Sequence, residues 1–118
     1  MSLKLVVDAQ TDEILGAQGV GGAGVDKRID VIATAMRGGL TASDLADLEL
    51  SYAPQFGSAK DPVHILGFIA ENQRDGLTQP IQWHDLHAEL ANGVQPIDTR
   101  HPATSARSPV QRALHHPV

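Results

Sequence analysis

Six histidines are the residues of this chain with the broadest chemical repertoire, and four of them form two close pairs. His84 and His87 lie three positions apart, and His115 and His116 are adjacent. Imidazoles at such spacing can bind zinc, but a zinc site requires three or four converging ligands and supporting hydrogen bonds. The sequence offers only two separate pairs, so we expect no metal site.

Thiol chemistry is excluded because the chain contains no cysteine. Disulfide bonds, thiolate metal ligands and a cysteine nucleophile therefore cannot form. A glycine-dense segment, GVGGAG at residues 19–24, could be taken for a nucleotide-binding fingerprint. It lacks the preceding parallel-strand unit and the acidic residue about 20 positions later that a dinucleotide site requires. We expect these glycines to allow close packing between a strand and a helix instead.

The size and charge of the chain restrict its class and its partners. With 118 residues and 42% hydrophobic residues, it can form one compact domain with a short appendage. Its net charge of -5, with nine Lys and Arg residues and no dense basic cluster, argues against a nucleic acid partner. No apolar run approaches the roughly 20 residues that cross a bilayer, and no signal-peptide pattern opens the sequence. We therefore expect a cytoplasmic protein without membrane contact.

The N-terminal part of the chain predicts a β-hairpin followed by a helix. Residues 3–8 and 13–20 are strand-like and flank a turn near Gln10 to Asp12. From Val25 to Arg37, apolar residues recur at three- and four-residue spacing, which is typical of an amphipathic helix. Charged residues of this helix, including Arg28, are expected on its solvent side. The expected buried face consists of Val25, Ile29, Ile32, Ala33 and Met36.

Two further helices are expected before residue 76. A short one is expected at about Ala42 to Asp47, because Thr41 precedes Asp44 by three positions in a capping arrangement. Asp61 and Pro62 have the residue types of an N-cap and a first helical position. The helix that they open is expected to run to about Asp75 and to end at Gly76. Its expected inward residues are Leu66, Ile69 and Ala70.

The sequence changes character after Gly76. Residues 77–82 are typical of a linker, and residues 83–90 predict a short amphipathic helix with three apolar side chains on one face. Residues 94–100 favour one brief strand. Residues 101–118 contain three prolines and little periodicity, which predicts irregular or disordered structure. The apolar face of the short helix consists of Trp83, Leu86 and Leu90.

Three successive segments carry a family resemblance: KLVVDAQTDEILGAQGVG, GVDKRIDVIATAMRGGLTASDLADLEL and SYAPQFGSAKDPVHILGFIAENQRDG. In that order they resemble the hairpin, the helix with its turn, and the closing loop and helix of the interface (dimerisation) domain of pyridine nucleotide-disulfide oxidoreductases. The branch that holds coenzyme A-disulfide reductases and NADH oxidases is the most similar. The resemblance covers about residues 3–76. It implies an α+β fold, with an antiparallel sheet of three to five strands and helices on one face.

The resemblance also implies a function for the loop after residue 50. In such enzymes the domain pairs with its copy in a homodimer and closes the flavin and redox-cysteine site of the opposite subunit. FAD and NAD(P)H are bound by other domains of the parent enzyme, so this fragment is expected to bind neither and to have no activity alone. Tyr52 is expected to face the partner's site, although it could instead pack in the interface with its hydroxyl in water. The residues expected to contribute are Tyr52, Ala53, Pro54, Phe56, Lys60 and Asp61.

His64 stands where close relatives usually carry Asn, and we expect a partly exposed residue in the first helical turn. The glutathione-reductase branch places a histidine and a glutamate in its interface domain as an acid-base pair. This chain has the sequence Tyr-Ala-Pro at residues 52–54 instead. His101 opens a sequence similar to the His-Pro-Thr motif of that branch, but it lies about fifty residues too late and lacks a partner glutamate.

Residues 81–100, IQWHDLHAELANGVQPIDTR, resemble the start of a rhodanese-like domain, in which a short helix precedes a strand that ends in Asp-x-Arg. We therefore predict a dimerisation domain at residues 1–76, a linker at 77–82 and a truncated, partly irregular rhodanese-like segment at 83–118. An alternative interpretation is an autonomous binding or regulatory module, or a degenerate rhodanese-like protein, without any reductase context.

Overall fold

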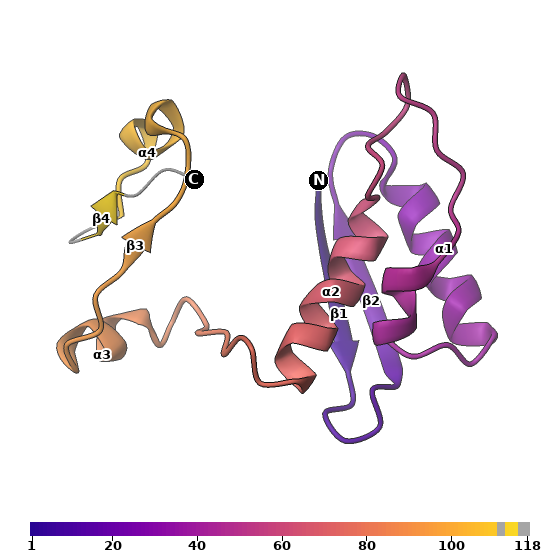
Figure 1. Cartoon of the computed structure of the whole chain (residues 1–118), viewed down its shortest axis with the longest axis horizontal. Coiled ribbons are helices and arrows are strands. Elements are labelled where there is room, and N and C mark those ends of the chain that lie inside the picture. Colours follow the sequence, from indigo (N-terminus) through magenta and orange to yellow (C-terminus); the bar gives the residue numbers. More distant parts are fainter. Residues whose placement is uncertain (111–112, 116–118) are drawn as a thin grey trace. The chain divides into compact units, whose positions relative to one another are not determined.

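A computed structural model describes residues 1–110 and 113–115 of the chain (Figure 1). The chain divides into two compact units, Met1–Gln79 and Pro80–Val118. The first unit contains the hairpin, the two long helices and the loop at residues 51–61. The second contains only short helices and strands.

The first unit begins with the expected antiparallel hairpin of β1 (Ser2–Val7) and β2 (Ile14–Val20). Its turn is closed by Asp8, whose Oδ1 accepts hydrogen bonds from the backbone N–H groups of Gln10 at 2.8 Å and Thr11 at 2.9 Å. Such a side-chain bond to the following backbone is a common way for aspartate to start a turn. The predicted hairpin is therefore confirmed.

The helix α1 (Val25–Arg37) has the predicted bounds and packs against β2. A Cβ at Gly19 of β2 would lie 2.6 Å from the Val25 Cγ1 atom of α1, so this glycine allows the close contact between strand and helix that is expected of the GVGGAG segment. Ile32 is buried as expected, and Ala35 is buried beside it. The expectation for Ala33 and Met36 is wrong, because both are exposed. The buried stripe follows the Ile32 and Ala35 positions, which face Leu45 and Val63 in the core.

A short 3-10 helix, η1 (Ser43–Asp47), and the helix α2 (Pro62–Arg74) complete the first unit. Thr41 and Asp44 exchange the expected hydrogen bonds at 2.8 and 3.3 Å. Where α2 crosses η1, a Cβ on Gly67 would lie 2.9 Å from the Ala46 Cα atom, so only glycine fits. The predicted inward orientation of Ile69 is wrong, because the residues of α2 that face η1 are those around Gly67 and leave Ile69 half exposed.

The core is small and consists of side chains from every element of this unit except β1. The α2 helix also packs against β1 and α1 (Figure 1). The α+β class is confirmed, but among the described residues the sheet of this unit has two strands and not three to five. After η1 the chain is extended at Leu48, yet the Leu50 N–H bonds back to the Leu48 carbonyl at 3.1 Å, so this segment joins no ladder. The buried residues of the hydrophobic core cluster are Ile14, Ile32, Ala35, Ala42, Leu45 and Val63.

The second unit contains α3 (Leu86–Ala91), β3 (Ile97–Asp98), α4 (Pro102–Arg107) and β4 (Leu114–His115). The strands β3 and β4 pair in parallel. The predicted helix starts later than expected and Trp83 is exposed before it, because the Asp85 N–H bonds to Gln82 O at 2.9 Å in a turn. The expectation of irregular structure after residue 100 is wrong for α4, whose start is capped by the His101 side chain. Residues 111–112 and 116–118 lie outside the described residues.

Within the described part of the chain, no helix is both long enough and apolar enough to cross a membrane.

Candidate functional site

The candidate loop, residues 51–61, connects the segment after η1 to the start of α2. Its centre is a tight turn in which the Ala53 carbonyl accepts the N–H groups of Phe56 at 2.9 Å and Gly57 at 3.2 Å. This turn leaves Tyr52 54% exposed and Phe56 88% exposed. Among residues 1–110 and 113–115, the Tyr52 hydroxyl has no hydrogen-bond partner. The loop therefore presents two large aromatic side chains to its surroundings.

Asp61 ends the loop and begins α2, as its residue type predicts. Its Oδ1 accepts the Val63 N–H at 3.0 Å, and Pro62 occupies the first helical position. An N-cap of this kind satisfies a backbone donor that the helix leaves unpaired. The first role of Asp61 is thus to fix the end of the loop on α2.

Arg28 of α1 forms a bidentate ion pair with Asp61, at 2.7 Å from Nη2 to Oδ2 and 3.3 Å from Nε to Oδ1. Both side chains are only 13% exposed. The Arg28 Nη1 also donates to the Gly24 carbonyl at 3.1 Å, so the guanidinium is held from both sides. The expected solvent position of Arg28 is wrong, because the helix periodicity could not show a carboxylate that arrives from a distant part of the sequence.

The charge of Asp61 is stabilised where it lies. Burial raises the pKa of the Asp61 carboxyl, but the hydrogen bonds from Arg28 and the Val63 N–H outweigh it, together with the charges of Arg28 and Lys27. The pKa is held below its ordinary value of 3.8. Asp61 is therefore an ionised anchor of the loop, and a contribution of Asp61 to a neighbouring site remains a prediction.

His64 is 6% exposed, so the expectation of a partly exposed residue is wrong. Its Nδ1 accepts the Asp61 N–H at 2.8 Å, which completes a capping box with the Asp61 side chain. Its Nε2 lies 2.7 Å from the Leu48 carbonyl oxygen. The signal that could have revealed this role is the position three residues after the N-cap, where an acceptor side chain reaches back to the cap.

Lys60 and the other predicted residues occupy different surroundings. The Lys60 Nζ lies 4.9 Å from the centre of the Phe68 ring, a cation-π contact that ties it to α2. Lys60 lines an open hollow of about 340 Å³, which Tyr52 also borders. Pro54 borders neither this hollow nor the smaller cavity beside it. That cavity, of about 30 Å³, is lined by Tyr52, Ala53, Phe56 and Asp61 together with Arg28 and His64.

The cavity of about 30 Å³ has room for little more than a water molecule. This cavity is therefore too small for a substrate, and the larger hollow beside Lys60 is open to solvent. What the structure brings together is a fixed base, made by Arg28, Asp61 and His64, and an exposed aromatic tip.

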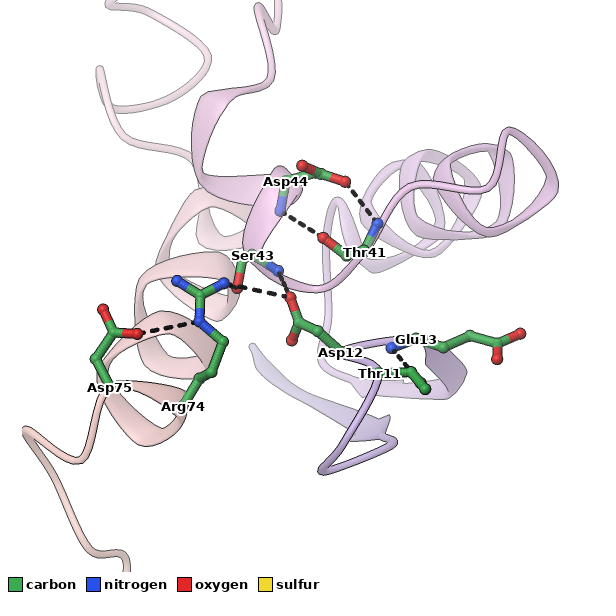
Figure 2. A network of polar contacts seen from close by, with 8 residues as sticks. All are labelled: Thr11, Asp12, Glu13, Thr41, Ser43, Asp44, Arg74 and Asp75. Carbon is green, nitrogen blue, oxygen red and sulfur yellow. Dashed lines mark hydrogen bonds and ion pairs between the residues drawn. The ribbon is translucent and has the colours of Figure 1, made fainter.

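A second polar network, which the sequence did not predict, lies at the opposite end of α2 (Figure 2). The Asp12 Oδ2 accepts the Ser43 N–H at 2.9 Å, and the Ser43 Oγ accepts a hydrogen bond from Arg74 at 2.7 Å. Arg74 also pairs with Asp75 at 3.0 Å and lies 3.8 Å from Asp12. This network joins the hairpin turn, η1 and the end of α2, and its arginine side chain is 49% exposed.

In the second unit, the Asp98 carboxylate is buried and receives three hydrogen bonds from Arg100 and one from Ser105. These bonds hold the pKa of Asp98 far below its ordinary range. The Asp-x-Arg sequence thus forms an internal ion pair that connects β3 to Ser105 of α4.

The histidine pairs give no cluster of three or more metal-ligating side chains among the described residues. His84 lies 3.4 Å from Asp85. His115 contacts the Arg100 carbonyl at 2.9 Å, and His116 lies outside the described residues.

Comparisons with known proteins agree with the fold of the first unit. The family model of the pyridine nucleotide-disulphide oxidoreductase dimerisation domain matches residues 1–62. Coenzyme A disulfide reductase of Staphylococcus aureus (strain bovine RF122 / ET3-1) is 39% identical over 71 residues, which are 60% of this chain and 16% of that protein. The corresponding protein of strain JH9 is 38% identical over 71 residues. The chain therefore spans a small part of the curated relatives that it matches.

Two solved structures are similar to nearly the whole chain. Reduced CoADR-RHD from Bacillus anthracis has a TM-score of 0.86 and 44% identity, over 98% of this chain and 21% of that one. The NAD-dependent persulfide reductase from A. fulgidus has a TM-score of 0.80 and 39% identity, over 98% and 20%. Since the family match covers residues 1–62 of 118, the chain belongs to the dimerisation domain family of the pyridine nucleotide-disulphide oxidoreductases.

Proposed function

We propose that this chain is the dimerisation part of an FAD- and NAD(P)H-dependent reductase and that its 51–61 loop completes the active site of the partner subunit in a homodimer. The observation that carries the proposal is the contrast within the loop. Its base is fixed by nearly buried charged groups, whereas Tyr52 and Phe56 are exposed at its tip.

Exposed aromatic side chains on an anchored loop are typical of a contact surface. Tyrosine and phenylalanine are enriched where proteins meet, because they bury a large area and lose little conformational freedom. Here the loop is held at Asp61 by a bidentate ion pair, so Tyr52 and Phe56 extend from a fixed base. A second copy of the chain, with the flavin domain of the parent enzyme, would supply the surface that covers them.

Tyr52 is the residue of the loop best suited to chemistry in the partner's site. Asp61 is engaged with Arg28, and Lys60 is tied to Phe68. The Tyr52 hydroxyl can donate a hydrogen bond to a thiolate or to a substrate carbonyl. In this proposal Ala53, Pro54 and Phe56 shape the loop around that hydroxyl.

The proposed substrate of the parent enzyme contains a sulfur–sulfur bond. Among the similar proteins, those from Staphylococcus aureus are named coenzyme A disulfide reductase and one solved structure is titled a persulfide reductase. The proposal includes a second possible activity, that of an NADH oxidase acting on oxygen. The dimerisation domain of such an oxidase would have the same fold. The present chain contains no cysteine, so the redox thiol belongs to another part of the parent protein, and the proposal assigns both cofactors to other parts as well.

We also propose that residues 83–118 are the beginning of a rhodanese-like domain, joined by a linker at 77–82 to a dimerisation domain at 1–76. The support is the likeness of 98% of the chain to a structure titled CoADR-RHD, and the Asp-x-Arg sequence that follows the helix α3. Sulfur transfer is not proposed for this segment, because it carries no cysteine.

A Tyr52→Phe substitution in the full-length protein that carries this chain tests the proposal. Loss of one hydrogen bond to a charged group should lower the turnover of the sulfur substrate by about tenfold or more. Reduction of the flavin by NAD(P)H, measured separately by rapid mixing, should keep its rate, because in this proposal the loop takes no part in that step. Unchanged turnover in a protein that remains dimeric would overturn the role of Tyr52.

The alternative is an autonomous binding or regulatory module. Two observations separate it from a reductase part: the coding sequence upstream of Lys4, and the size of the isolated chain in solution. The reductase proposal requires flavin- and nicotinamide-binding regions upstream and a dimer whose population rises with concentration. A strict monomer at high concentration would favour the autonomous module.

A further inference from the structure

We propose that His64 is a positioning residue that clamps both ends of the candidate loop through its two ring nitrogens and thereby sets where Tyr52 is presented. The consequence for catalysis rests on the proposed function, but the clamp itself is a property of this chain.

The two contacts of His64 require one particular form of the imidazole ring. The Asp61 backbone N–H can only donate, so Nδ1 carries no proton and accepts at 2.8 Å. The Leu48 carbonyl can only accept, so Nε2 carries the proton and donates at 2.7 Å. The ring is therefore neutral with its proton on Nε2, and both of its nitrogens are engaged.

These two partners lie on either side of most of the loop. Leu48 is the C-cap of η1, three residues before the loop begins, and Asp61 is the last residue of the loop and the N-cap of α2. A single buried ring thus connects the entry of the loop to its exit. The Arg28 ion pair adds a third attachment, from Asp61 to α1.

The interior of the loop has no comparable attachment by hydrogen bonds. Its hydrogen bonds join only loop residues: the Ala53 turn, and the Ser58 Oγ that donates to the Lys60 carbonyl at 3.3 Å. Lys60 has its cation-π contact with Phe68 near the exit of the loop. The position of Tyr52 near the entry therefore depends on how Leu48 and Leu50 are held. Both side chains pack against the core, and His64 adds the hydrogen bond that fixes the Leu48 carbonyl.

Substitutions at residue 64 can separate the two halves of the clamp. In His64→Asn, the side-chain oxygen occupies roughly the place of Nδ1 and can still accept the Asp61 N–H, whereas nothing reaches Leu48. In His64→Gln, the longer amide can donate to Leu48 but no acceptor remains at the Nδ1 position. His64→Leu keeps a buried side chain and removes both contacts.

The test uses the full 118-residue chain and three NMR measurements. The nitrogen shifts of His64 report its protonation, the amide exchange rate of Asp61 reports the cap, and the ring signals of Tyr52, the only tyrosine, report the loop entry. The unsubstituted chain should show an unprotonated Nδ1 and a protonated Nε2. His87→Leu, at an exposed position of α3, is the control and should leave the Asp61 and Tyr52 signals unchanged.

The clamp predicts opposite results for the two amide variants. His64→Gln should raise the exchange rate of the Asp61 amide by about 5- to 30-fold, as expected for one lost hydrogen bond, with Tyr52 nearly unchanged. His64→Asn should keep the Asp61 amide protected and move the Tyr52 signals toward those of an unstructured tyrosine. Both changes should appear in His64→Leu.

The proposal is overturned if Tyr52 keeps its signals in His64→Asn, or if Nδ1 is found protonated in the unsubstituted chain. Should His64→Leu fail to fold, the Asn and Gln variants still decide the question. Failure of the clamp is distinct from failure of the proposed function. The first is measured on this chain alone, and the second depends on the turnover of Tyr52→Phe in the full-length protein.

Discussion

The two ends of α2 are held by polar networks that contain similar groups but differ in their exposure to water. At the loop end, Arg28 and Asp61 are each 13% exposed and share a bidentate contact. At the hairpin end, Arg74 is 49% exposed and divides its contacts among Asp12, Ser43 and Asp75. A charge that is shielded from water depends strongly on its partner, whereas an exposed charge can exchange its partner for solvent.

This comparison explains why the loop end is suited to function. The shielded pair and the His64 contacts hold the loop base, so the exposed Tyr52 and Phe56 need no contacts of their own to stay in place. The hairpin end presents no such aromatic tip, and its network serves to hold η1 against the hairpin turn. Rigid support beneath an exposed side chain is the usual requirement of a preorganised site.

The largest effect is expected from Gly67→Ala, because both networks depend on the contact between α2 and η1. A new Cβ would meet the backbone of Ala46, with its Cα at 2.9 Å, so the two helices must separate. We expect a loss of about 3 kcal/mol in the free energy of unfolding. In an isolated helix, replacing glycine by alanine would stabilise the helix by about 0.5–1 kcal/mol. A loss of stability in this protein would therefore show that the contact with Ala46 outweighs the helix preference.

Chemical denaturation measures this loss. Gly16→Ala is the matched control, since a Cβ at Gly16 has nothing within 4 Å. If Gly67→Ala is as stable as this control, the close approach of α2 to η1 is not the contact that seats the helix.

The next largest effect is expected from Arg28→Met, which keeps most of the side-chain volume and leaves the Asp61 charge without its partner. Removal of one hydrogen-bonded charge from this largely buried pair should lower the free energy of unfolding by about 2 kcal/mol. The same denaturation experiment checks it. A double variant with Asp61→Asn should recover part of the loss, because no unpaired charge then remains.

A smaller effect is expected from the Asp61 charge alone, and it depends on pH. The pKa of Asp61 is lowered in the folded chain, so its stabilising contribution is complete above the ordinary value of 3.8 and is lost as pH falls through the lowered value. Asp61→Asn can still cap α2 but lacks this contribution. Melting temperatures of the two proteins should differ at neutral pH and converge in acid; a constant difference would contradict the ion pair.

The smallest effect is expected from Arg74→Met at the hairpin end. The Arg74 side chain is 49% exposed and Asp75 is 53% exposed, so water reaches the guanidinium even though Asp12 is only 16% exposed. The loss of stability should be well below that of Arg28→Met under the same conditions. Equal losses at the two arginines would remove the distinction between the two ends.

Local rules predicted the elements of the first unit well, because each depends on neighbours in the sequence. The bounds of α1, the Asp61 cap and the end of α2 near Gly76 follow from periodicity, capping and glycine. The Arg28–Asp61 pair could not be predicted in this way, since its partners are far apart in sequence and Arg28 lies next to charged residues on a helix.

The remaining errors have similar physical causes. The sequence predicts a partly exposed His64 from its place in the first helical turn, yet two backbone groups converge on it and its side chain is buried. The resemblance implies a sheet of three to five strands, but among the described residues the sheet of this unit has two, and Leu48 and Leu50 pack against the core. The placement of the six loop residues against a partner's site depends on surfaces that this chain does not contain, so it remains a prediction.

Mixed dimers of the full-length protein give the most direct test of the claim that the loop acts across the subunit boundary. One subunit carries Tyr52→Phe, and the other carries a substitution that inactivates its flavin-binding region. The mixed dimer should recover about half of the turnover of the unsubstituted dimer, because the intact redox site of the first subunit meets the intact loop of the second. Mixed dimers no more active than either parent variant would show that Tyr52 does not act in the partner's site.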